Sequence, residues 1–397
     1  MSDVARANDH PAEHHAFSLV QGGPLYQLLR RLHLSGADLQ MLRRRITVML
    51  AVLWLPPLLL AILEGHAWGG AGVPFLADIG AQVRFLIALP LLLAAERAVH
   101  QQMVGSIPLF IKRGIVDDAH RARFAEAVAS ARRTLQSVPV ELALLAFVYI
   151  LGFSGALLDV SDAAWHNTIT DGRRTTTWAG WWLTIVSLPL FQFLLLRWYV
   201  RLLVWWRFLW QVSRVRLKLQ PLLPDRLGGL GFVSRLSAAF APLLLAQSAL
   251  ASGLIADQLF YAHASLSDFR LEIAGVGIFL LATIVVPLFA FAPRLARAKL
   301  DGLADMETLS MRTARQFSQR WLRPHPAGEP SLPNDPDLHS LADLRDGYEL
   351  VCNMRVVPIS MPALTVLLIA ALAPMLPLLL TTFSPLEMVS GVAKLLF

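Results

Sequence analysis

The chain has 397 residues, of which 55% are apolar and 16% are charged, against roughly 25% charged residues in an ordinary soluble domain. Its mean hydropathy is +0.53, and its one cysteine is Cys352. These values exclude a disordered chain, a disulfide scaffold and a coiled coil. They indicate an all-α integral membrane protein, because helices satisfy their own backbone hydrogen bonds in lipid.

The apolar residues gather in stretches long enough to cross about 30 Å of hydrocarbon. We therefore predict a seven-span helical bundle with membrane-proximal cytoplasmic helices. The predicted spans are 46–63, 79–97, 138–158, 178–198, 237–258, 272–292 and 357–380.

The basic residues predict the orientation of these spans. All 35 lysine and arginine residues except Arg84, Arg173, Arg174, Arg270 and Lys394 lie in or beside alternate segments, starting from the N-terminal one. The positive-inside rule then places the N-terminus in the cytoplasm and the C-terminus outside. The net charge of +7 thus predicts attraction to anionic inner-leaflet lipid, not binding to nucleic acid.

The segments are predicted in chain order. Residues 1–45 form a cytoplasmic tail with an interfacial helix opened by Pro24, and residues 46–293 form a six-span membrane domain with cytoplasmic loops 98–137 and 199–236. In the first loop, a soluble helix over Asp117–Gln136 is expected to extend the third span. Residues 199–210 are rich in both Trp and Arg. This stretch either continues the fourth span or bends into the headgroup zone.

The remainder is predicted as two parts. Residues 294–356 form a cytoplasmic segment with a helix over about 295–322, a Pro-rich linker and a second helix from about Leu338. Residues 357–397 form the seventh span and an outer-face C-terminus with a short interfacial helix.

The densest local motif is a turn directly before the fifth span, at 224–232. Glycine permits positive φ and close backbone approach, and an aspartate can hydrogen-bond the turn after Pro224. Exposed amide groups in such a turn can hold a phosphate or a lipid headgroup, and a tight turn packed on the membrane face explains the same residues. The candidate residues are Asp225, Arg226, Gly228, Gly229 and Gly231.

Ionisable residues at membrane depth are costly and need a partner or water. Near the outer side, Arg84 is predicted to pair with Glu64 or Asp257. Near the inner side are Glu96, Glu141, Arg197 and Arg201. Charge pairing or snorkelling is favoured for these residues over an ion pathway. In the fifth span, Gln247 lies near the midplane, and small residues at intervals of four lead to Asp257, which fits either a packing seam or a pore-lining face.

Catalytic motifs of known mechanics are missing from the sequence. It has no H-E-x-x-H, G-x-S-x-G, Walker A or C-x-x-C motif, and no dinucleotide-binding glycine motif in strand context. We therefore predict no catalytic residue, metal ligand or cofactor, and an enzyme acting on lipid ranks third among the functions.

Two parts of the chain resemble a family of multi-pass bacterial inner-membrane proteins with no assigned activity. One is the turn Pro-Asp-Arg-Leu-Gly-Gly-Leu-Gly-Phe at 224–232. The other runs from Leu341-Ala-Asp-Leu through Tyr348-Glu-Leu-Val and Met354-Arg-Val-Val-Pro to Leu378-Leu-Leu-Thr and Pro385-Leu-Glu-Met. The resemblance implies a bacterial inner membrane, hence a periplasmic C-terminus, and no activity. Leu223 stands where we associate a histidine with the family, which argues against a metal site there.

Transport of an ion or small polar solute is the first function that we predict. Arg84 would be the fixed charge, Asp257 its partner or gate, and Gln247 a hydrogen-bonding site at the midplane. The alternative is a non-transporting scaffold or sensor that binds a protein partner or lipid through its cytoplasmic face. Association into a homo-oligomer is expected in either case.

Overall fold

The computed structural model describes Leu19 and residues 41–69, 73–153, 165–170, 173–261, 265–319 and 336–379 of the chain. The predicted interfacial helix at Pro24, most of the Pro-rich linker and the predicted interfacial helix after Pro385 lie outside these residues.

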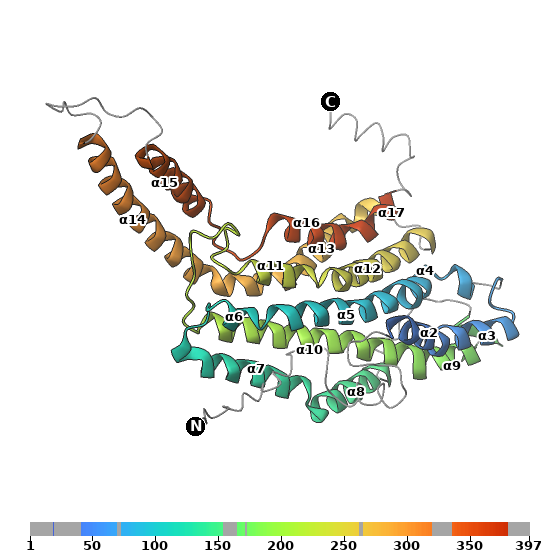
Figure 1. The fold of residues 1–397 in the computed structure, drawn as a ribbon. Helices are drawn as coiled ribbons and strands as arrows, with labels where there is room; N and C mark the ends of the chain where they lie inside the picture. Colours follow the sequence, from blue (N-terminus) through green and yellow to red (C-terminus); the bar gives the residue numbers. More distant parts are fainter. Residues whose placement is uncertain are drawn as a thin grey trace, which may run out of the picture.

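Helices make up nearly all of the described chain (Figure 1). The bounds of the first half are α2 (Leu42–Leu53), α3 (Leu55–Leu63), α4 (Ile79–Gln82), α5 (Leu89–Ser106), α6 (Leu109–Lys112), α7 (Arg121–Leu135), α8 (Val138–Phe153), α9 (Trp178–Trp182) and α10 (Leu188–Ser213). Those of the second half are α11 (Gly231–Ala238), α12 (Ala241–Tyr261), α13 (Arg270–Val285), α14 (Ala292–Phe317), α15 (Pro336–Cys352), α16 (Met361–Leu372) and α17 (Leu376–Leu379).

The described residues are almost entirely helical, which fits the predicted all-α membrane class. Within the described residues, six continuous helices are long and apolar enough to cross a membrane, and a seventh span results if α7 and α8, which bend by 42° at their junction, are counted as one. An all-α expectation missed the short antiparallel hairpin of β1 (Asn167–Thr170) with β2 (Arg173–Thr176).

Three element boundaries answer or correct the expectations. The helix α10 runs unbroken to Ser213, so residues 199–210 continue the fourth span and the loop after it is shorter than predicted. The predicted helix over Asp117–Gln136 is present as α7 (Arg121–Leu135), but it meets α8 at a bend of 42° and so does not extend the third span as one straight helix. The sixth span continues directly into α14, giving one helix from Leu266 to Phe317.

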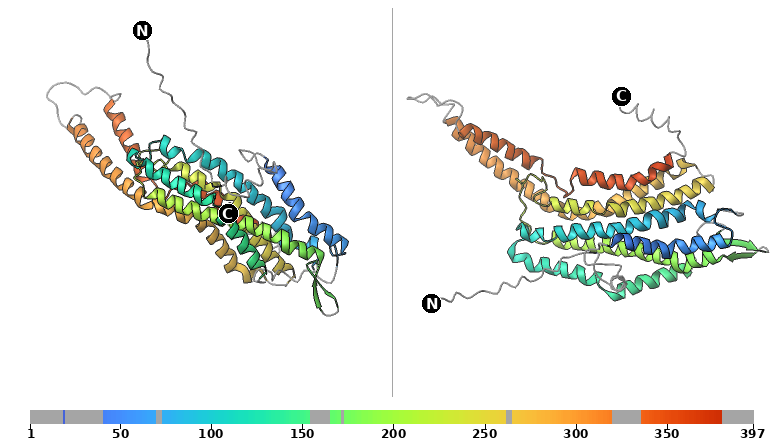
Figure 2. Two further views of the ribbon diagram at one scale, coloured as in Figure 1. Left: turned by 90° about the horizontal axis from the view of Figure 1, so that it is seen from below. Right: turned by 45° about the vertical axis from the view of Figure 1, so that its right-hand side comes forward.

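The long helices lie roughly along one axis in layers (Figures 1 and 2). Helices α5 and α10 lie side by side in the middle, with α12, α13 and α16 on one side and α7 and α8 on the other. Helices α2 and α3 pack against α5 and α9. The hairpin of α14 and α15 projects beyond one end of the bundle, and β1–β2 lies at the opposite end.

Prolines interrupt most spans, and the carbonyls that they free are used to join helices. A proline lacks an N–H, so the carbonyl four residues earlier loses its helical partner. In several described spans a side chain from another helix donates to that carbonyl, as buried backbone in lipid requires. These bonds run from Trp182 Nε1 to Val52 O (3.1 Å, before Pro56), Ser187 Oγ to Leu53 O (2.7 Å, before Pro57), Tyr149 OH to Ile185 O (3.2 Å, before Pro189) and Trp206 Nε1 to Thr283 O (2.8 Å, before Pro287).

Two of the spans also widen into π-helix directly before a Leu-Pro pair. The segments are η2 (Val83–Ala88), before Pro90, and η4 (Leu183–Ser187), before Pro189. The wider turn relieves the contact between the proline ring and the preceding carbonyl. Arg84 therefore lies in a π-helical turn.

Candidate functional site

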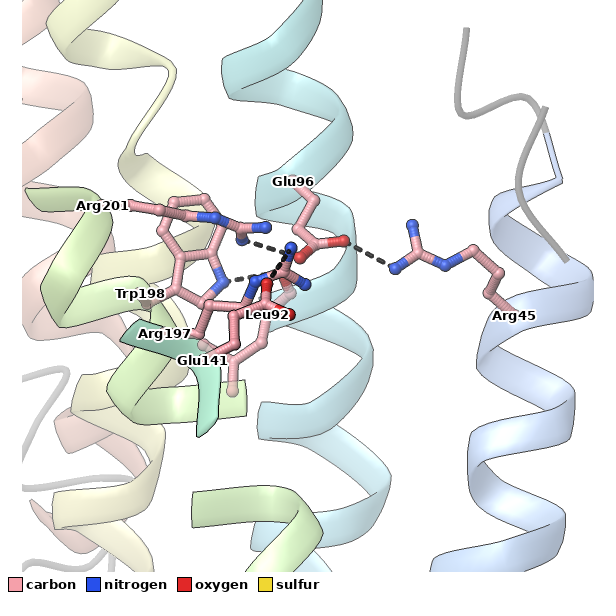
Figure 3. A network of polar contacts seen from close by, with 7 residues as sticks. All are labelled: Arg45, Leu92, Glu96, Glu141, Arg197, Trp198 and Arg201. Carbon is pink, nitrogen blue, oxygen red and sulfur yellow. Dashed lines mark hydrogen bonds and ion pairs between the residues drawn. The ribbon is translucent and has the colours of Figure 1, made fainter. Parts of the chain in front are cut away.

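A network of charged side chains lies buried between four helices (Figure 3). Glu96 on α5 accepts from two arginines, one on each carboxylate oxygen: Arg45 Nη2 on α2 at 2.6 Å and Arg201 Nη1 on α10 at 2.7 Å. One turn earlier on α10, Arg197 Nη2 pairs with Glu141 Oε1 of α8 at 3.1 Å. The network therefore joins the first, second, third and fourth spans.

Burial makes these contacts strong. Arg45, Glu96 and Arg201 are each 3% exposed or less, and a low local dielectric strengthens a satisfied charge pair while raising the cost of an unsatisfied one. Trp198 supports the arrangement, since its ring stacks under the Arg201 guanidinium at 4.9 Å and its Nε1 donates to Leu92 O at 3.2 Å.

The network carries one excess positive charge among the five charged side chains described in it. Arg45, Arg197 and Arg201 face the carboxylates of Glu96 and Glu141. Two guanidinium nitrogens, Arg45 Nε and Arg201 Nη2, are buried without a hydrogen-bond partner. Both belong to the arginines that share Glu96.

A small cavity adjoins the network on the side of α7 and α8. Its volume is about 20 Å³, and its lining includes Arg197, Arg201, Glu141, Ser137 and Leu19. This is enough for one water molecule or an ion of similar size, which needs roughly 10–15 Å³.

The two carboxylates predicted near the outer side, Glu64 and Asp257, accept from backbone N–H groups at helix N-termini. Glu64 accepts from the backbone N of Trp178 at 2.8 Å, and Asp257 Oδ2 accepts from Gly80 N at 3.0 Å. Arg84 interacts electrostatically with Asp78 and Asp257, and it makes no ion pair within 4 Å among the described residues. The predicted pairing of Arg84 with Asp257 is thus present as an electrostatic interaction without a close ion pair, and the described residues show no contact of Arg84 with Glu64. The unsatisfied N–H groups of α4 and α9 hold both carboxylates.

The fifth span makes close helix contacts through its polar and small residues. Gln247 Oε1 accepts from Tyr199 OH of α10 at 3.1 Å, and Ser248 Oγ donates to Ala371 O of α16 at 2.6 Å. A Cβ added at Gly253 would lie 3.2 Å from Val83 Cβ. These contacts fit the packing seam better than a pore-lining face.

Asp78 and Trp165 complete the outer end. Asp78 caps α4 through Ala81 N at 2.7 Å and accepts from Trp165 Nε1 at 3.0 Å. His166 follows Trp165 and is buried. Its Nδ1 accepts from Asn167 Nδ2 at 2.8 Å, which leaves the proton of the neutral ring on Nε2, 3.4 Å from Thr184 Oγ1.

Stability at this end should fall in acid. Burial lowers the pKa of His166 below its ordinary value, against a smaller opposing effect of Asp78. The unfolded chain then binds a proton below about pH 6.5 that the folded chain resists, so stability is full above that pH and falls as the pH drops through it. We expect the unfolding temperature of His166→Gln to fall less between pH 7.5 and pH 5 than that of the wild-type protein. Parallel profiles, measured by thermal unfolding in detergent, would contradict this, since every other histidine is common to both proteins.

The glycine-rich turn binds its own carboxylate. Asp225 Oδ1 accepts from Leu227 N at 2.9 Å and Gly229 N at 3.2 Å, and Oδ2 accepts from Gly231 N at 3.1 Å. Positive φ at Arg226 (54°), Gly228 (61°) and Gly229 (94°) turns these amides inward. Asp225 thus occupies amides that the sequence interpretation would offer to a phosphate, and lipid binding at Arg226 stays a prediction.

The same turn anchors the projecting hairpin. Arg226 O accepts from Arg355 N at 2.8 Å, and Lys299 Nζ of α14 donates to Cys352 O and Met354 O at the end of α15, at 2.6 and 2.9 Å. An open groove of about 610 Å³ runs between residues 217–222 and α14. Its lining includes Lys218, Arg297, Asp301, Asp305 and Met306.

Sequence reasoning missed Arg45, Asp78, Trp165 and His166. For Arg45 the sequence does contain a signal, because Arg45, Met49 and Leu53 are spaced four residues apart and so share one face of a helix. In the structure all three are buried. Neither Trp165 nor His166 has a local signal, since both lie in the connection before β1. Among the described residues, no group of three or more His, Cys, Asp or Glu side chains is placed to hold a metal ion.

The chain matches no family model, no curated protein and no solved structure in our comparisons. The resemblance to an uncharacterised family of inner-membrane proteins stays a prediction.

Proposed function

We propose that this protein is a non-transporting scaffold of a bacterial inner membrane, with a cytoplasmic N-terminus and a periplasmic C-terminus. In this proposal the spans are an anchor and the hairpin α14–α15 binds a protein partner in the cytoplasm. The hairpin is the observation that carries the proposal.

The length of the hairpin supports a role outside the lipid. The helix from Leu266 to Phe317 has 52 residues, or ~78 Å at 1.5 Å per residue, whereas hydrocarbon is about 30 Å thick. Its apolar part lies before Ala292, and α14 carries charged residues along most of its length. More than half of this helix therefore has no lipid to cross.

One face of α14 offers apolar side chains to a partner. Leu300 is 65% exposed and Met311 is 59% exposed, and eleven residues bring them back to one face after three turns. The face against α15 is a different one, since Met306 lies against Gly347. A protein partner that covers this face would bury both side chains, and exposed apolar surface marks interaction sites where it is contiguous.

Transport of an ion or small polar solute finds less support in the geometry. Of its three residues, Asp257 and Gln247 bond to neighbouring helices. Arg84 lies in a π-helical turn against two aspartates. These contacts match charges that join helices, which is the role that a scaffold gives them.

A photoreactive residue placed on the long helix tests the proposal. At Leu300 or Met311 it should capture a discrete protein, and at Ile278, on α13 of the same helix and 69% exposed, it should capture lipid only. The captured partner, once purified, should bind the wild-type protein and lose about tenfold in affinity with Leu300→Asp, as expected for an anchor residue. Equal capture at all three positions would contradict a hairpin-specific partner.

Flux measurements supply the opposing outcome. Proteoliposomes with wild-type protein should pass K⁺, Na⁺, Cl⁻ and protons no faster than empty vesicles, and Asp257→Ala should lower the unfolding temperature. Wild-type flux above that of empty vesicles, abolished by Asp257→Ala in a protein that still folds, would overturn the scaffold in favour of transport.

A further inference from the structure

Among the described residues, the buried charge network contains three arginines and two glutamates. Glu96 is shared between Arg45 and Arg201, so one carboxylate neutralises two guanidinium groups. Arg197 and Glu141 add one charge of each sign. Among the described residues, the excess positive charge therefore lies with the arginines that share Glu96.

Arg201 contributes to this excess positive charge and also has an unsatisfied N–H group. Its side chain is 2% exposed, and its Nη2 is buried with no hydrogen-bond partner. A buried N–H of a charged group without an acceptor costs more than an ordinary lost hydrogen bond. An isolated buried charge costs more still, so proteins compensate such charges.

The cavity beside the network has room for an ion that would compensate the excess positive charge. Arg201 and Arg197 both line it, at the junction of α7 and α8. Its volume of about 20 Å³ suits a monatomic anion slightly larger than water. Glu141, whose carboxylate pairs with Arg197, also lines the cavity, and apolar side chains, including Leu19 and Leu144, make up much of the rest of its lining.

We propose that this cavity binds a chloride ion that accepts a hydrogen bond from Arg201 Nη2. The anion neutralises the network and couples α10 to the α7–α8 junction. Sulfate and phosphate are excluded by size, and a water molecule would satisfy the N–H without cancelling the charge. The site is independent of the hairpin proposed as the partner-binding surface.

Chloride should stabilise the full-length protein in a saturable manner. A ligand that binds only the folded state raises stability with the logarithm of its concentration once it exceeds Kd. We expect the unfolding temperature to be higher in chloride or bromide than in gluconate or sulfate at equal ionic strength. Crystals grown in bromide should show an anomalous peak within hydrogen-bond distance of Arg201. Equal unfolding temperatures in all four salts, or a water peak alone at Arg201, would overturn the proposal.

Two matched variants at Ser137 test the location. Ser137 lines the cavity and directly precedes α8, where aspartate and asparagine cap a helix equally well. Ser137→Asp supplies a tethered negative charge and should remove the chloride dependence. Ser137→Asn should keep it, because the side chain has the same shape without the charge. Equal chloride dependence in both variants would place the anion elsewhere and overturn the site.

Discussion

Glu96→Gln should lower the free energy of unfolding by about 3–5 kcal/mol, the range found when one partner of a buried charge pair is removed. The change keeps the side-chain volume and leaves Arg45 and Arg201 opposite a neutral amide, with both guanidinium groups 3% exposed or less. Unfolding in mixed micelles of detergent and SDS, followed by far-UV circular dichroism, measures the loss.

Two further measurements test whether the loss comes from the contact between Glu96 and its arginines. Glu126→Gln changes an exposed glutamate on α7 at the same end of the bundle, and it should alter stability by less than about 0.5 kcal/mol. Arg201→Met should cost less in the Glu96→Gln background than in the wild type, because the two side chains are in direct contact. Additive effects of the two changes would show that Glu96 and Arg201 are not coupled.

Hydropathy predicted the spans because lipid selects for long apolar stretches, whatever the contacts between helices. It does not report helix rotation, and rotation decides which charge is buried. Arg43, Arg44 and Arg45 have the same charge and adjacent positions, and only the spacing of four residues to Met49 and Leu53 distinguishes Arg45; in the structure Arg45 pairs with Glu96 while Arg43 and Arg44 are exposed. The positive-inside rule treats all three as anchors at the membrane surface.

Depth alone predicted the partners of Arg84 only in part. Glu64 and Asp257 were expected to pair with Arg84 because all three were placed near the same membrane surface, and Asp257 does interact electrostatically with Arg84, but helix N-termini compete for both carboxylates. The starts of α4 and α9 hold Asp257 and Glu64. Which helix start lies next to which carboxylate depends on the packing of separate spans, and no local pattern encodes it.

The hydrogen bonds at the prolines could be predicted from the sequence only in part. Their positions predict where carbonyls are freed, as with Val52 before Pro56 and Thr283 before Pro287. The donors, Trp182 and Trp206, look in the sequence like aromatic residues of a membrane interface. Only the packing of the spans assigns each indole N–H to a carbonyl.

Asp225→Ala should cost about 3 kcal/mol of stability. Three backbone N–H groups of the glycine-rich turn lose a charged acceptor; one hydrogen bond to a charged group contributes about 1.5–3 kcal/mol, and three bonds to a single carboxylate are not additive. The turn also presents Arg226 O to Arg355 N at 2.8 Å, so the return from α15 to the seventh span should loosen with it. Hydrogen exchange at residues 352–360 and the unfolding temperature measure the two effects together. Asp301→Ala, an exposed aspartate of the nearby groove, is the matched control and should leave both unchanged. If Asp225→Ala lowered stability without faster exchange at 352–360, the turn would be important for folding but would not anchor the hairpin.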